Sequence, residues 1–326
     1  MLAAYTETPN FDDPLAALIV GDRPEPAAED GCLKVRVEAA SLNRHDLWTL
    51  RGVTQHPPLP LPMILGCDGA GRLDDGTPVI IYPGIGFPDW RHEETLDARF
   101  HVLSELRPGT MADVIVVPER CVIPRPPELS AIEAAALGTA WLTAYKMLFA
   151  HSGLRPGQRM LVQGASGGVS TALVQLGRAA GMEIWVTGRS ERSRALALAL
   201  GADRVFESGA PLPDTVDVVF ETVGEATWSH SLDAVRRGGK IVIAGRTSGK
   251  SPQAGLRRIF VNQLTVQGSV LGSLDDMRDL VRMVVQTGIR PKIGSVMPLA
   301  EARQGFLDMW EGRSVGKTVF TNAPQE

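Results

Sequence analysis

The stretch LVQGASGGVSTALVQLGRAAG, residues 161–181, constrains the fold of this chain more than any other. An apolar run is followed by Gly164, Gly167 and Gly168, and then by small and apolar residues at helical spacing. A strand, a glycine-rich turn and a helix in this order bring backbone N–H groups and the positive end of a helix dipole close to a pyrophosphate. The spacing is GxxGGV rather than GxGxxG, so the loop by itself also fits an ordinary helix cap. The second strand expected at residues 182–187 favours nucleotide binding.

The residues after this second strand bear on the choice between the two nicotinamide dinucleotides. An NAD site usually carries Asp or Glu there, about 20 residues beyond the loop, to bind the ribose 2′-OH. This chain has Gly188, Arg189 and Ser190, with Arg194 further on. An arginine pairs with a 2′-phosphate, whereas a carboxylate repels it. The sequence therefore predicts NADPH, with Arg189 as the main contact; the alternative is that these arginines are surface charges of the next helix.

The sequence pattern differs between two parts of the chain. The first part is rich in proline and glycine, and its residues 33–39 alternate between apolar and polar, as in a half-buried strand. From Ser130, which has Glu133 three residues later in a capping-box arrangement, strands and helices alternate. This alternation predicts an α/β fold with a doubly wound parallel sheet. The expected strands of this part are residues 158–163, 182–187, 216–221, 240–244 and 264–270, and the expected helices are 168–180, 192–200 and 274–286.

Composition and charge exclude several classes of protein. The 326 residues are enough for two domains, and 33 basic against 37 acidic residues give a net charge of −4, which argues against a nucleic-acid-binding protein. Cys32, Cys67 and Cys121 are too far apart for a disulfide framework or a CxxC zinc site. No apolar run approaches the roughly 18–20 residues of a membrane span, and the N-terminus lacks the pattern of a signal peptide. We expect a soluble, cytoplasmic protein that binds neither nucleic acid nor membrane.

Several segments resemble the medium-chain dehydrogenase/reductase superfamily, in particular its zinc-independent quinone oxidoreductase-like branch. In chain order they are AASLNRHDLWTLRG, LPMILGCDGAG, RPGTMADVIVVP, AAALGTAWLTAYKML, VQGASGGVSTALVQLGRAAG and GKTVF. The resemblance implies a GroES-like, β-rich catalytic domain made of residues 1–130 and 273–326. It implies a Rossmann cofactor domain at residues 131–272, with substrate and nicotinamide meeting between the two domains. It also implies a homodimer, formed where relatives pair their sheets through the strand at residues 264–270.

The resemblance bears on metal binding as well. Zinc-dependent members hold their catalytic zinc at three positions that are Asn43, Cys67 and Thr139 in this chain, and the surface lobe that carries a structural zinc in relatives has no cysteine here. A zinc site wants three protein ligands of N, S or O type. We therefore expect no metal ligands; an improvised set of His45, Cys67 and Asp68 is the alternative.

The first motif supplies the catalytic candidates, Asn43, His45, Asp46 and Trp48, because the resemblance implies that it faces the substrate. His45 can act as an acid near neutral pH. Asp46 is either catalytic or a structural hydrogen-bond acceptor, and the indole of Trp48 can stack on a planar substrate. Water is the alternative source of the proton.

The cofactor candidates extend beyond the glycine-rich loop. They are Thr143, Gly164, Ser166, Gly167, Gly168, Val169, Gly188, Arg189, Ser190, Arg194, Gly245, Gly316 and Lys317. Together these features predict an NADPH-dependent, zinc-independent reductase of a quinone or an α,β-unsaturated carbonyl, since such acceptors need no Lewis acid. Two alternatives stay open: an alcohol dehydrogenase with a rearranged metal site, and a nucleotide-binding or redox-sensing protein without turnover.

Overall fold

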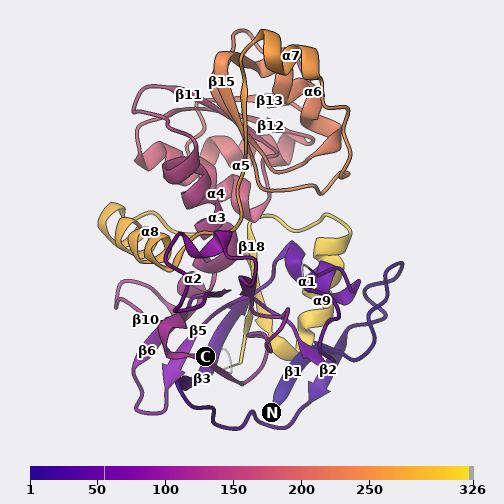
Figure 1. Cartoon of the computed structure of the whole chain (residues 1–326), viewed down its shortest axis with the longest axis vertical. Coiled ribbons are helices and arrows are strands. Elements are labelled where there is room, and N and C mark those ends of the chain that lie inside the picture. Colours follow the sequence, from indigo (N-terminus) through magenta and orange to yellow (C-terminus); the bar gives the residue numbers. More distant parts are fainter. Residues whose placement is uncertain (55, 323–326) are drawn as a thin grey trace. The chain divides into compact units, whose positions relative to one another are not determined.

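The computed structural model describes residues 1–54 and 56–322 (Figure 1). Residues 55 and 323–326, which the sequence analysis assigned to the first domain, lie outside the described residues. Within those described ranges, no helix is both long enough and apolar enough to cross a membrane.

The chain divides into two compact units. Unit 1 consists of Met1–Ala140 and Ser273–Glu326, and unit 2 consists of Trp141–Gly272. The ends of the functional domains, expected at residues 130 and 272, remain a proposal. The predicted fold class is confirmed, because a β-rich unit accompanies a unit built on a parallel sheet.

Most of the regular elements of unit 1 are β-strands, and one of them covers the alternating residues 33–39. Its strands are β1 (Leu2–Thr6), β2 (Ile19–Asp22), β3 (Cys32–Ser41), β4 (Met63–Ile64), β5 (Asp68–Leu73), β6 (Pro78–Ile81), β7 (Gly84–Ile85), β8 (His101–Val102), β9 (Val114–Pro118), β10 (Val122–Pro124), β17 (Ile293–Pro298) and β18 (Lys317–Thr321). Its α-helices are α1 (Arg44–Leu50), α2 (Ala131–Ala135), α8 (Leu274–Thr287) and α9 (Ala302–Trp310).

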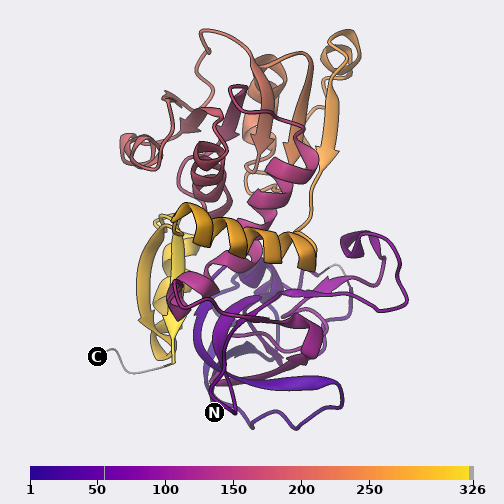
Figure 2. The ribbon, with the colours of Figure 1, turned by 90° about the vertical axis from the view of Figure 1, so that its left-hand side faces the viewer.

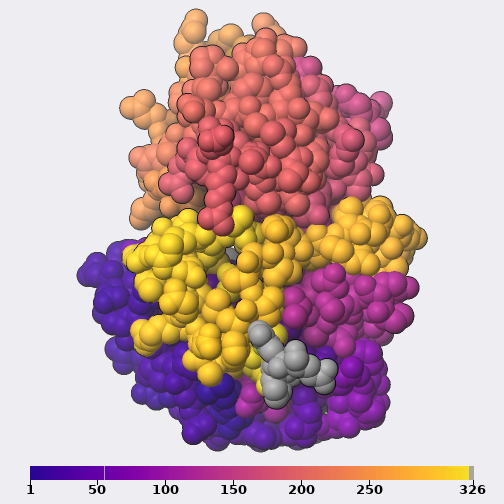
Figure 3. All heavy atoms as spheres, turned by 180° about the vertical axis from the view of Figure 1, so that it is seen from behind, coloured from indigo at the N-terminus to yellow at the C-terminus, as the bar shows by residue number. Residues whose placement is uncertain are grey.

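The main sheet of unit 1 joins strands from both ends of the chain. Its order is β10-β6-β5-β3-β18-β17, with β9 also paired to β3. Antiparallel pairing of β18 with β3 sets Val319 opposite Ser41. Figure 2 shows the yellow C-terminal strands beside the purple early strands, and in Figure 3 yellow and indigo residues share one face of this unit. The pairing therefore brings the late GKTVF segment to the first motif.

Unit 2 is a six-stranded, all-parallel sheet with packed helices, in the order β13-β12-β11-β14-β15-β16. Its strands are β11 (Arg159–Gln163), β12 (Glu183–Gly188), β13 (Arg204–Glu207), β14 (Val216–Glu221), β15 (Val235–Ile243) and β16 (Thr265–Gly268). Its α-helices are α3 (Leu142–Tyr145), α4 (Gly168–Ala179), α5 (Glu191–Ala199), α6 (Glu225–Ala234) and α7 (Leu256–Val261). The apolar faces of these strands form a core that includes Leu161, Trp185 and Val219.

The capping box predicted at Ser130 is present: Ser130 is the N-cap of α2 and pairs with Glu133. A second box, which was not predicted, has Ser273 as the N-cap of α8 and Asp276 as its partner. Each side chain satisfies a backbone N–H group that the first turn of a helix leaves unpaired.

Candidate functional site

A buried polar cluster in unit 1 is centred on Asp68, the first residue of β5, whose side chain is fully buried. Ser41 Oγ and Asn43 Nδ2 donate to Asp68 Oδ2 at 2.9 and 2.8 Å. The backbone N–H and the hydroxyl of Thr139 donate to Asp68 Oδ1, each at 2.6 Å. Lys317 Nζ lies 3.3 Å from Asp68 Oδ2. The carboxylate is thus surrounded by donors, which is the condition for keeping a charge out of water.

Lys317 reaches this cluster because it is the first residue of β18, which pairs with β3. Its ammonium group donates to Leu42 O at 2.9 Å and to Asn43 Oδ1 at 2.6 Å, besides its pairing with Asp68. An ammonium group has three protons, so these contacts use all of them. In the structure this ammonium group contacts Asp68, and the predicted role of Lys317 in cofactor binding stays a prediction. The preceding Gly316 has a positive φ of 74°, and an added Cβ would lie 2.3 Å from Lys292 O.

The side-chain amide of Asn43 is likewise fully occupied by hydrogen bonds. Its amide nitrogen donates to Asp68 and to Ser41 O, at 3.3 Å for the latter, while its oxygen accepts from Lys317. Its backbone N–H donates to Asp46 Oδ2 at 2.8 Å, at the start of α1. Both amide hydrogens have partners, so Asn43 orients the cluster and has no N–H left for a ligand.

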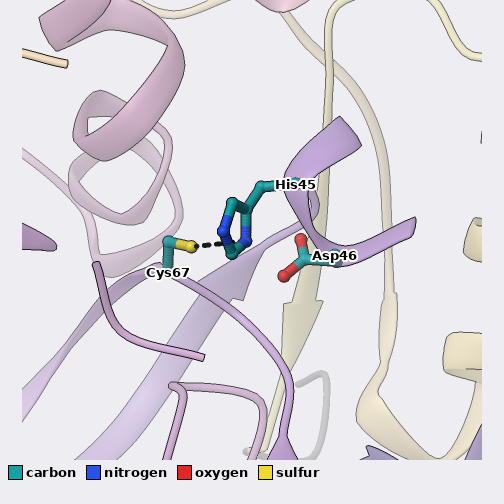
Figure 4. Close-up of side chains that lie close together, drawn as sticks. All are labelled: His45, Asp46 and Cys67. Carbon is teal, nitrogen blue, oxygen red and sulfur yellow. Dashed lines mark hydrogen bonds between the residues drawn. The ribbon is translucent and has the colours of Figure 1, made fainter. Parts of the chain in front are cut away.

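His45 lies in a second group of side chains, shown in Figure 4. Its Nδ1 is 3.3 Å from Cys67 Sγ, and its Nε2 is 3.2 Å from Glu105 Oε1. Glu105 has only 3% of its side chain exposed, whereas His45 has 22%. Burial alone lowers the pKa of His45, but the hydrogen bond to Glu105 and the nearby carboxylates outweigh it and raise the pKa above its usual value.

Asp46 and Cys67 are fully buried beside His45. Asp46 Oδ1 accepts from the backbone of Gly66 at 2.9 Å and, as described, its Oδ2 accepts from the Asn43 backbone. Burial raises the pKa of Asp46 to about 6 and that of Cys67 well above its usual value. Asp46 therefore ties α1 to the segment before β5, which favours the structural interpretation of this residue.

Trp48, one turn further along α1, is half-buried. The guanidinium group of Arg51 lies 5.1 Å from the centroid of its ring and 4.0 Å from that of Phe11. These contacts fix the indole beside an arginine through cation–π attraction.

The glycine-rich loop of unit 2 connects β11 to α4 as predicted. Gly164 has a φ of 86°, a left-handed conformation that suits glycine. Gly167 is the exposed N-cap of α4, and a Cβ built on it would meet only Ser170 Oγ, at 3.9 Å. The space at the helix N-terminus is therefore open, so the loop fits a dinucleotide pyrophosphate. Ser166, Gly168 and Val169 are partly exposed, and Thr143 is buried.

The end of β12 carries no carboxylate. Gly188 is buried, and an added Cβ would lie 2.8 Å from Ser193 Oγ. Arg194 Nη1 donates to Gly188 O at 2.9 Å, and Ser190 caps α5. Arg189 is exposed beside them. This end of the strand has arginine where an NAD site has the acidic residue that binds the ribose 2′-OH, so it fits the 2′-phosphate of NADPH better. Gly245, on the loop after β15, is a glycine because an added Cβ would lie 2.3 Å from Thr222 O.

Glu105 was missed by the sequence analysis. Its Oε2 accepts from the backbone of Val102 at 3.1 Å, which fixes the carboxylate opposite His45. An acid inside the otherwise apolar run VLSEL was its only signal in the sequence.

Comparison with known proteins decides the family. Residues 29–127 match the "Alcohol dehydrogenase GroES-like domain" family and residues 168–286 the "Zinc-binding dehydrogenase" family. The mouse synaptic vesicle membrane protein VAT-1 homolog is 30% identical over 335 residues, covering 92% of this chain and 79% of that protein. The chain belongs to the medium-chain dehydrogenase/reductase superfamily.

Further similarities place it in the quinone oxidoreductase-like branch of this superfamily of oxidoreductases. Rat quinone oxidoreductase is 27% identical over 315 residues, covering 92% of this chain and 91% of that one. A solved NAD-dependent alcohol dehydrogenase is 32% identical, with a TM-score of 0.93 and coverage of 99% of this chain and 100% of the other.

The residues at the superfamily's catalytic zinc positions do not fit that metal. Asn43 and Thr139 both turn toward Asp68, and Asn43 Oδ1 already binds the ammonium group of Lys317. Cys67 Sγ instead contacts His45 and donates to a backbone carbonyl. One thiol beside a bound ammonium ion does not make the three-ligand site that a catalytic zinc requires.

Proposed function

We propose that this protein is an NADPH-dependent, zinc-independent reductase that transfers hydride to a quinone or an α,β-unsaturated carbonyl. The observation that carries the proposal is the Lys317–Asp68 ion pair, which holds Asn43 and Thr139 where metal-dependent relatives hold zinc. Without a Lewis acid an alcohol is a poor hydride donor, whereas a conjugated carbonyl already carries its own electron sink. The similarity to quinone oxidoreductases supports the same class of acceptor.

NADPH, when bound, supplies the hydride. We propose that the backbone of Gly164, Gly167 and Gly168 holds its pyrophosphate at the N-terminus of α4. Arg189 pairs with the 2′-phosphate, and beside it lies Arg194, which donates to Gly188 O and lies 3.5 Å from Glu207 Oε1.

His45 is the donor to the oxygen of the acceptor. Of the four catalytic candidates, Asn43 has both amide hydrogens engaged and Asp46 is fully buried, whereas His45 keeps 22% of its side chain exposed. Its Nδ1 faces a sulfur, which is a weak acceptor, so this N–H can turn to a developing enolate oxygen. Trp48, on the same helix, is the surface on which a planar acceptor stacks.

The test is steady-state oxidation of NADPH with a panel of quinones, enones and simple alcohols, using protein freed of metal by a chelator. We expect turnover of quinones or enones at an undiminished rate, and no alcohol-dependent reduction of NADP. Alcohol oxidation that a chelator abolishes would instead establish the second candidate, an alcohol dehydrogenase with a rearranged metal site. The proximity of His45, Asp46 and Cys67 is the observation that favours that candidate.

In the same assay, His45→Gln should lower kcat by about 10²-fold or more, the usual range for removing a general acid. NADPH affinity should not change, because the substitution lies in the other unit from the glycine-rich loop. His92→Gln, an exposed histidine of unit 1, is the matched control and should leave kcat unchanged. An unaltered kcat in His45→Gln would show that water protonates the product.

Cofactor preference gives a separate prediction. NADPH should bind at least about tenfold more tightly than NADH, as expected for one charge-assisted pair of roughly 1–3 kcal/mol. Arg189→Ala should remove most of this difference and leave NADH affinity nearly unchanged, as measured by fluorescence titration. Arg192→Ala, on the exposed side of α5, controls for the general loss of positive charge. Equal affinity of the unaltered protein for both cofactors would contradict the assignment.

We also propose a homodimer formed through β16, the edge strand of the unit 2 sheet. Beside this edge, Leu256 and Phe260 of α7 are 70% and 69% exposed, and Val270 is 50% exposed. Exposed apolar side chains next to an unpaired strand edge favour association with a second copy. Phe260→Glu should halve the mass measured by light scattering, whereas Leu198→Glu, at a leucine of α5 that is 48% exposed, should not.

A further inference from the structure

His45 and Cys67 form a hydrogen bond whose length also matches the spacing of two ligands of one metal ion. Their Nδ1 and Sγ atoms are 3.3 Å apart and point toward each other (Figure 4). A zinc-like ion with N and S ligands at about 2.0 and 2.3 Å separates those ligands by roughly 3.5 Å at a tetrahedral angle. Together with a carboxylate oxygen of Asp46, the ligand atoms all lie within 4.8 Å of one another. The spacing therefore suits a shared metal ion.

The imidazole is also oriented as in a metal site. Glu105 Oε1 is 3.2 Å from His45 Nε2, which leaves Nδ1 directed at Cys67. Metal-binding histidines almost always donate their second N–H to such a carboxylate or carbonyl. The segment that supplies Glu105 contains Ser104 at a φ of 69°, an uncommon backbone conformation for a residue other than glycine. Strain of this kind concentrates at functional sites.

The charges around the sulfur favour a cation. Cys67 is surrounded by the carboxylates of Asp46, Asp68 and Glu105, all of which are buried. Asp68 is paired with the ammonium group of Lys317, and Asp46 accepts from the backbone N–H groups of Asn43 and Gly66. Carboxylates at low exposure attract a cation that binds at the sulfur.

We propose that His45 Nδ1, Cys67 Sγ and a carboxylate oxygen of Asp46 form a site for a soft divalent cation, Zn²⁺ or Cd²⁺, that switches the reductase off. Of the superfamily's zinc positions this site shares only Cys67. On binding, the thiol proton and the proton of His45 Nδ1 leave to solvent, and the metal ion forms one bond with the sulfur and one with the freed lone pair of Nδ1, with no change of oxidation state. The partly exposed ring of His45 is the route of entry. The inhibition rests on the proposed function, because the ion binds His45, the proton donor of that reaction. Binding of the ion does not depend on the proposed function.

The binding test uses Cd²⁺ and purified, chelator-treated full-length protein. We expect about one Cd²⁺ per chain and an ultraviolet thiolate-to-cadmium charge-transfer band. Cys67→Ser should lose the band, and His45→Gln should weaken Cd²⁺ binding about tenfold or more. Cys121→Ser is the matched control, since Cys121 is equally buried and its thiol bonds only to a carbonyl, Gly84 O, among the contacts described. Cys67→Ala replaces the serine variant if that variant does not fold.

The activity test adds Zn²⁺ to the metal-free reductase. We expect loss of most NADPH oxidation, reversal by chelator, and no inhibition of Cys67→Ser by Zn²⁺ when its rate is compared with the metal-free rate of the same variant. A missing cadmium band, or a band that survives Cys67→Ser, overturns the site. Activation by Zn²⁺ overturns the inhibitory role. If no acceptor is reduced at all, the proposed function fails while the cadmium band still tests the site.

Discussion

Lys317→Met should destabilise the protein by about 3–5 kcal/mol, the usual cost of breaking a buried ion pair from one side. The substitution keeps an unbranched side chain that is one atom shorter, but it leaves the fully buried Asp68 without its positive partner. Leu42 O and Asn43 Oδ1 lose their donor at the same time. The measurement is the free energy of unfolding from urea titration, with the m-value checked for two-state behaviour.

Two further variants separate the charge effect from loss of packing. Lys240→Met removes an ammonium group that donates to His151 O at 2.6 Å, and it should cost only about 1 kcal/mol. Adding Asp68→Asn to Lys317→Met removes both charges and should recover much of the lost stability. If Lys317→Met costs no more than Lys240→Met, the ion pair is not what holds the cluster together.

Gly167→Val should weaken NADPH binding by about 100-fold or more, a loss of roughly 2.7 kcal/mol. A branched side chain at the N-cap of α4 fills the open space where a pyrophosphate approaches the backbone. Because a Cβ there meets only Ser170 Oγ at 3.9 Å, stability should fall by less than about 1 kcal/mol. Fluorescence titration with NADPH measures the first effect and urea unfolding the second.

Gly21→Val is the matched control for this substitution. A Cβ built on Gly21, in β2 of unit 1, has no atom within 4 Å, so valine fits there as well. This variant should bind NADPH normally. Unchanged NADPH affinity in Gly167→Val would show that the glycine-rich loop is only a helix cap.

Much of unit 2 was predictable because its signals are local. Alternating strands and helices and the glycine-rich loop are each set within a few residues, and the structure has them in place. Elements β13, α6 and α7 were not predicted. The sequence of β13, RVFE, is short and its two outer residues are exposed, so it has little apolar periodicity. Helix α6, EATWSHSLDA, is only weakly amphipathic, so its sequence likewise does not show a clear helical pattern.

The polar cluster of unit 1 was less predictable, because long-range pairing creates it. Asn43 and His45 were identified as candidates, but nothing local indicates that Lys317 donates to Asn43 or that Glu105 faces His45. The alternative metal-ligand set inferred from the sequence, His45, Cys67 and Asp68, differs from the observed cluster in one residue. Asp68 is held by Lys317 and Thr139, and Asp46 stands beside His45 and Cys67 in its place.

The pairing of β18 with β3 has a consequence for how the chain is made. During synthesis Asp68 emerges from the ribosome long before Lys317, so its counter-charge does not yet exist when the early strands of unit 1 can first collapse. All of unit 2, by contrast, lies between these two residues in the chain and can fold while it is being translated. The early strands of unit 1 therefore lack the cation that offsets the burial of Asp68 until β18 is released, and a chain interrupted before Lys317 has to bury this carboxyl group without its positive partner.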